Sequence, residues 1–148
     1  MMVLKRNITT LLILCFCVAV IPSMQAQTVM QKLKSGPQTD RFAEALDKTD
    51  LGSKLERSGP YTLFVPYNEA FDKLTSGQKV DRDLLLNHIF TGMATVRSLK
   101  AMSEVTCLSG RTIKIGSGQQ LTVDSFRILQ SNIRAENGVI HIIEGVIR

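Results

Sequence analysis

The stretch that decides the fold is Tyr61–Phe71, which reads Tyr-Thr-Leu-Phe-Val-Pro-Tyr-Asn-Glu-Ala-Phe. Its first five residues are β-branched, aromatic or aliphatic, a composition typical of a buried strand. Pro66 lacks a backbone N–H and should end this strand. Asn68 stands where a helix N-cap is favoured, and Glu69 would interact well with the positive end of the helix dipole. We therefore expect a buried strand followed at once by a short helix.

The chain on either side of this stretch reads as mainly helical. Within Gln27–Asp50, apolar residues recur at helical spacing, which predicts a helix with one buried face. Gly59-Pro60 should stop any helix before the strand. Asp81 can cap a further helix that runs through Leu84–Ile89, and Thr91-Gly92 should close it.

The last third of the chain has the shorter period of strands. Val105–Leu108 and Thr112–Ile115 flank Ser109-Gly110, which predicts a hairpin. Asn137-Gly138 is a second turn signal, followed by the apolar run Val139–Ile143. Helices that precede strands favour an α+β fold with a largely antiparallel sheet, in one domain over residues 27–148.

Residues 1–26 have the layout of a secretory signal peptide. Lys5 and Arg6 precede an uncharged run, Ile8–Ile21, and Ala26 offers a small residue for cleavage. An uncleaved anchor is the alternative, but the run is shorter than the ~20 residues of a membrane span. We expect a secreted or periplasmic protein with no stable membrane insertion after cleavage.

The charge and cysteine content restrict the function further. Removing residues 1–26, which carry two of the 18 basic residues and no acid, leaves a net charge of +3. There is no Trp and no basic stripe, so nucleic acid is not an expected partner. Cys15 and Cys17 lie in the signal segment, which leaves Cys107 alone. Its strand-like surroundings favour a buried core residue over a reactive thiol.

Candidate catalytic groups are few. His88 lies among leucines and His141 among isoleucines, so each reads as a core histidine more readily than as a general base. Two isolated histidines and one cysteine do not have zinc spacing, and no acidic loop resembles a calcium site. We expect no metal, no cofactor and no enzymatic activity.

Three segments together resemble the fasciclin-like domain family. Tyr61–Phe71 is similar to its first signature, Leu84–Gly92 to its central Leu…His…Gly segment, and Asn137–Ile147 to its closing signature. The resemblance implies the fold above and signatures that are mainly structural. Their residues here are Phe64, Pro66, Asn68, Glu69, Ala70, Phe71, His88, Asn137, Gly138 and His141.

The resemblance also implies a function, because fasciclin-like domains are surface or matrix modules associated with adhesion. In animal members an Asp-Ile pair before the closing signature has been tied to integrin binding. Asn132 and Ile133 occupy that place here, which makes them candidate interaction residues but removes the carboxylate. The chain looks most like single-domain, secreted bacterial members.

Three hypotheses follow. The first is a monomeric or weakly oligomeric interaction module that binds a cell-surface or extracellular protein or glycan. The second is a small-ligand-binding domain that uses a cleft beside the sheet. The third is a hydrolase or redox protein that uses Cys107. The first is favoured because the sequence predicts export and one domain, offers no catalytic constellation and resembles this family, and the family analogy has the most weight.

Overall fold

The computed structural model describes residues 25–148, so nearly all of the predicted signal peptide lies outside the described residues. Six helices precede or interrupt the strands in this part of the chain. In chain order they are α1 (Val29–Ser35), α2 (Asp40–Asp47), α3 (Leu51–Arg57), α4 (Asn68–Thr75), α5 (Arg82–Leu86) and α6 (Val96–Lys100).

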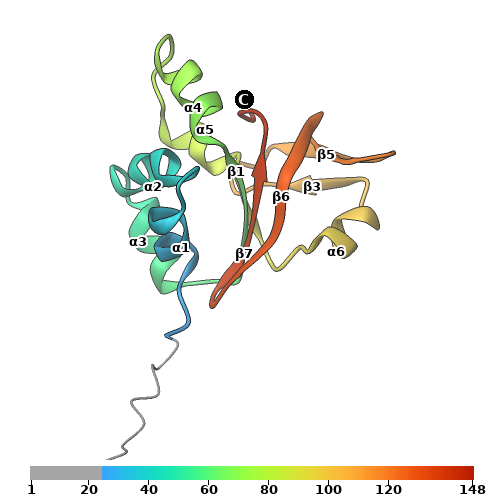
Figure 1. Cartoon of the computed structure of the whole chain (residues 1–148), viewed down its shortest axis with the longest axis horizontal. Helices are drawn as coiled ribbons and strands as arrows, with labels where there is room; N and C mark the ends of the chain where they lie inside the picture. Colours follow the sequence, from blue (N-terminus) through green and yellow to red (C-terminus); the bar gives the residue numbers. More distant parts are fainter. Residues whose placement is uncertain (1–24) are drawn as a thin grey trace, which may run out of the picture.

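The helix predicted over Gln27–Asp50 is two helices. Pro37 disfavours the helical conformation at the residue before it, and Gly36 ends α1 with its N–H on the Leu33 carbonyl at 3.2 Å. The chain then turns and restarts as α2. With α3, these helices form the layer on one side of the sheet in Figure 1.

The strands make one mixed sheet in the order β2-β1-β7-β6-β5-β4-β3. Only β1 and β7 run parallel, and the other neighbouring pairs are antiparallel. This confirms the α+β prediction. The strands are β1 (Tyr61–Pro66), β2 (Ile89–Thr91), β3 (Glu104–Thr106), β4 (Thr112–Ser117), β5 (Leu121–Val123), β6 (Phe126–Ala135) and β7 (Gly138–Ile143).

The end of one predicted helix differs from the structure. The helix expected to reach Thr91-Gly92 ends at Leu86, because the following residues pair with β1 as strand β2. Gly92 has a φ of +110° in the turn after β2 instead of ending a helix. Strand β6 is the longest of the described chain, and its pairing with β7 is interrupted by bulges. The hairpin at Ser109-Gly110 is as predicted.

The sheet separates two apolar cores. Successive side chains of a strand point to opposite faces, so Leu63 and Val65 of β1 join the core beneath the helices while Phe64 joins the other core. Ile140 and Ile143 of β7 divide in the same way. Within residues 25–148 no helix has the length and apolarity to cross a membrane.

Candidate interaction surface

His141 lies in the core and ties together segments that are distant in the sequence. Its Nε2–H donates to the Ala94 carbonyl at 2.7 Å, and its Nδ1 accepts from the Asn132 N–H at 3.3 Å. Thr62, also buried, accepts from the Ala94 N–H at 2.8 Å and donates to the Gly92 carbonyl at 2.7 Å. The segment between β2 and α6 is thus fixed to the sheet by two buried polar side chains.

His88 plays a comparable part at the C-terminus. Its Nδ1–H donates to the Leu84 carbonyl at 2.9 Å, and its Nε2 accepts from the Ile147 N–H at 3.0 Å. Burial lowers the pKa of His88 to about 4 and also lowers the pKa of His141. Both rings are therefore neutral near pH 7, with each ring nitrogen hydrogen-bonded to the backbone.

Asn132 and Ile133 are also engaged within the domain. Asn132 has a φ of +56° at a bulge of β6, and its Oδ1 accepts from the Val96 N–H at the start of α6, at 3.0 Å. Ile133 packs partly against the core beneath the helices. The side-chain amide oxygen of Asn132 thus positions α6.

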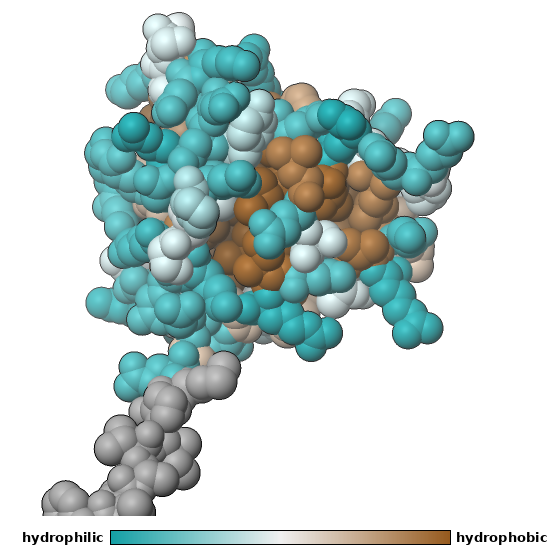
Figure 2. Space-filling model, viewed as in Figure 1, coloured by the Kyte–Doolittle hydropathy of each residue, from teal (hydrophilic) through white to brown (hydrophobic). Residues whose placement is uncertain are grey.

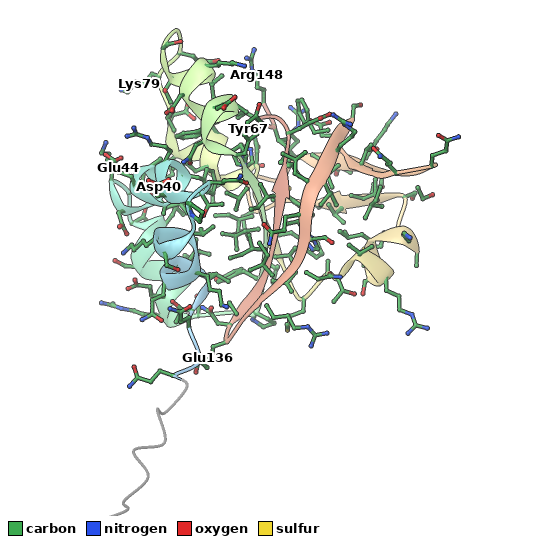
Figure 3. The ribbon with its side chains drawn as sticks, viewed as in Figure 1. Asp40, Glu44, Tyr67, Lys79, Glu136 and Arg148 are labelled. Carbon is green, nitrogen blue, oxygen red and sulfur yellow. The ribbon has the colours of Figure 1, made fainter. Side chains whose placement is uncertain are left out.

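Asn137 and Gly138 join the helical layer to the sheet. Asn137 Oδ1 accepts from the Val29 N–H at 2.9 Å, and its amide donates to the carbonyls of Leu55 and Ser58. A Cβ at Gly138 would collide with the Tyr61 carbonyl of the parallel neighbour. Figure 3 shows the neighbouring Glu136 at the end of the molecule where the described chain begins.

The predicted N-cap role of Asn68 is wrong, because Tyr67 occupies the N-cap of α4 and Asn68 is its first residue. Its side chain points to α2, where Oδ1 accepts from the Arg41 N–H at 3.3 Å and Nδ2 donates to Asp40 Oδ1 at 2.6 Å. Thr39, the N-cap residue of α2, makes no side-chain cap bond. The Asn68 side chain, which is distant in the sequence, instead provides an acceptor at the start of that helix.

The remaining signature residues lie in or beside the core. Phe64 and Pro66 are buried in β1, and Phe71 is buried with its ring edge-on to Phe42 at a centroid distance of 5.7 Å. Ala70 is half-buried, and Glu69 is exposed in the first turn of α4. These residues stabilise the junction of β1 and α4.

Cys107 is buried in the core on the sheet's other side. Burial raises the pKa of its thiol to about 11, so the thiolate that acts as nucleophile is scarce at neutral pH. Among residues 25–148 no group of three or more His, Cys, Asp or Glu side chains is placed to hold a metal ion.

A groove lined by both apolar and polar side chains runs between α6 and strands β5 and β6. Its volume is about 400 Å³. Val96, Leu121, Ile128 and Leu129 supply its apolar lining, and Leu129 is 50% exposed. The only charged lining residues in the described chain are Lys100 and Arg127. We call the six residues named here the α6–β6 surface.

The electrostatic character of this surface is positive. Arg127 pairs with Glu144 at 2.8 Å, whereas Lys100 has no carboxylate within 4.0 Å in the described part of the chain. Figure 2 shows apolar residues gathered on the face that carries β6 and β7, with hydrophilic residues around them. Sequence reasoning missed this surface. The available signal was Ile128-Leu129, since adjacent strand residues point to opposite faces and one must leave the core.

The sequence matches the fasciclin domain family over residues 37–148. Relatives include mouse stabilin-1, 30% identical over 86% of this chain, and pig transforming growth factor-beta-induced protein ig-h3, 34% identical over 68%. This chain spans only 6% and 16% of those proteins. The Synechocystis protein sll1483 is 28% identical over 82% of this chain and 73% of its own length.

A solved structure has the same fold. It is a FAS1 domain pair from the insect cell adhesion molecule fasciclin I, with a TM-score of 0.71 and 17% identity over 82% of this chain and 51% of that one. The family match covers most of the chain, and the fold agrees with it. The chain belongs to the fasciclin domain family.

Proposed function

We propose that this chain is an exported, non-enzymatic interaction module that binds a cell-surface or extracellular protein or glycan. The observation that carries the proposal is the α6–β6 surface, where half-exposed Leu129 lies beside Lys100. Similarity to a domain pair of an insect cell adhesion molecule supports the same class of function.

The location of the reactive side chains supports a function without catalysis. His88 and His141 are fully buried, and both nitrogens of each ring are bonded to the backbone. Cys107 is 4% exposed. A substrate at the surface would reach none of these groups, and a general acid or base must come within hydrogen-bond reach of its substrate.

The face of the sheet is a better binding surface than its edges. Strand β2 has only three residues, and its outer edge is partly occupied, because the Leu108 N–H donates to the Ile89 carbonyl at 2.8 Å. Strand β3 at the other end has only three residues. A partner that adds a strand needs a long free edge, so we infer docking against side chains of the α6–β6 surface.

The side chains of this surface fit a partner that presents an apolar side chain flanked by acidic groups. Leu129 and Leu121 would cover the apolar group, and Lys100 would lie near the acid. We therefore favour a protein partner, with an acidic glycan as the alternative outcome. The proposed location is the periplasm or the cell exterior, reached through cleavage of residues 1–26, and the proposed state is a monomer or weak oligomer.

The test is capture of envelope and extracellular material on beads that carry residues 27–148. Beads with the Phe71→Ala variant are the control, since truncating a buried Phe costs about 3–5 kcal/mol, a large part of the stability of a small domain. Protease treatment of the captured material separates a protein partner from a glycan. Equal retention by both kinds of beads would reject the proposal.

A further inference from the structure

A second groove lies on the helix side of the sheet, between α1 with the turn that follows it and strands β6 and β7. Its floor is formed by Ile133, Ile140 and Ile142, and Leu33 forms part of its wall. The turn from Gly36 to Thr39 closes one side. The groove has a volume of about 340 Å³, within the ~300–1,000 Å³ typical of small-molecule sites. We call it the α1–β7 groove.

The polar groups of this groove are few. Lys32 is the only charged residue that lines it within the described chain, and the amides of Gln38 and Gln130 are the flexible uncharged donors. Lys32 is half-buried and has no carboxylate within 4.0 Å in residues 25–148, whereas the nearby Lys34 pairs with Asp47 at 2.9 Å. The groove therefore combines apolar walls with one cation that lacks an internal partner.

We propose that the α1–β7 groove binds a single-chain amphiphile with an anionic head group, of the fatty carboxylate class. The alkyl chain lies on the isoleucine floor, where burial removes apolar surface from water. The carboxylate pairs with Lys32 and accepts from the Gln38 and Gln130 amides. A neutral or cationic amphiphile leaves Lys32 unpaired or repelled, so the head-group charge determines selectivity.

This site is distinct from the α6–β6 surface. The two grooves share no lining residue, so a ligand in one does not require a partner at the other. The ligand proposal therefore stands or fails independently of the partner proposal.

The experiment is isothermal titration calorimetry of the protein purified after export, with dodecanoate below its critical micelle concentration. Decanoate tests the role of the chain, and dodecyltrimethylammonium tests the role of charge. We expect 1:1 binding of dodecanoate, roughly fourfold weaker binding for each methylene removed, and at least tenfold weaker binding of the cation.

Two variants and a control locate the site. Lys32→Gln should weaken dodecanoate binding about fivefold and remove the preference over the cation, because it deletes one partly exposed ion pair. Ile133→Gln should weaken binding of dodecanoate and decanoate alike. Leu129→Gln, in the other groove, should change neither affinity.

Absence of saturable dodecanoate binding would overturn the proposal. So would equal affinity for the cation, or Leu129→Gln weakening dodecanoate binding while Lys32→Gln does not. Circular dichroism of each variant establishes that a lost affinity is not lost folding.

Discussion

Asn132 Oδ1 accepts a hydrogen bond from the Val96 N–H at 3.0 Å, which joins a bulge of β6 to the first residue of α6. The same residue donates its own N–H to the buried His141 ring. Asn132 is a candidate interaction residue by the resemblance to fasciclin-like domains. In the structure it holds in position the helix that borders the α6–β6 surface.

Replacing Asn132 should lower the free energy of unfolding through two separable effects, the loss of a hydrogen bond and backbone strain. Asn132→Ala loses the hydrogen bond to Val96 and strains a backbone at φ +56°, so we expect a loss of about 2 kcal/mol in the free energy of unfolding. Asn132→Gly loses the hydrogen bond but relieves the strain, so it should lose about 1 kcal/mol. Urea denaturation measures both, and equal stability of the wild type and both variants would refute this role.

The free energy of unfolding should decrease as the pH is lowered from 6.5 to about 4 because of the buried histidines. The pKa of folded His88 is lowered to about 4, so in this window the unfolded chain binds more protons than the folded one. The contribution of neutral His88 is fully present above pH 6.5 and is lost as the pH falls toward 4. His88→Asn should remove up to about 1.4 kcal/mol per pH unit of the slope. Denaturant titrations at pH 7, 6 and 5 test this, and an unchanged slope would count against it.

Cys107 should react with thiol reagents only when the domain opens. Its thiol is buried and its pKa is raised to about 11, so little thiolate exists at pH 8. We expect labelling by a disulfide reagent to be slow in buffer and fast in concentrated urea. Rapid labelling of the folded protein would reopen the redox hypothesis.

Asn68 should protect the start of α2 more than the start of its own helix. Asn68→Ala should cost about 1 kcal/mol and speed hydrogen exchange at the Arg41 amide, which loses its acceptor. The Phe71 amide donates to the Tyr67 carbonyl and should keep its protection. The opposite pattern, with faster exchange at Phe71 alone, would restore Asn68 as the cap of α4.

The fold was largely predictable from the sequence because its signals are local. The apolar run before Pro66 and the turn at Asn137-Gly138 each specify an element whatever surrounds it. The break between α1 and α2 was also present at Gly36-Pro37. The strand β2 was not predictable, because Ile89–Thr91 becomes a strand only by pairing with β1.

The surfaces were harder to predict than the elements. The Asn68 side chain contacts α2 because folding brings α2 beside α4, and no local sequence pattern indicates that contact. Leu129 is exposed at a bulge, where the pairing of β6 with β7 shifts between Ile128 and Gln130. A one-residue shift moves a strand side chain to the other face, so exposure along β6 depends on where the bulges fall.

The most direct test of the central claim compares capture of envelope and extracellular material by three variants of the α6–β6 region. Leu129→Ser and Lys100→Gln alter the proposed surface, and Met102→Ser removes an exposed apolar side chain that does not line it. We predict that Leu129→Ser reduces capture at least tenfold and Lys100→Gln severalfold, while Met102→Ser matches the wild type. Equal capture by the wild type and all three variants, with folding intact, would contradict the account.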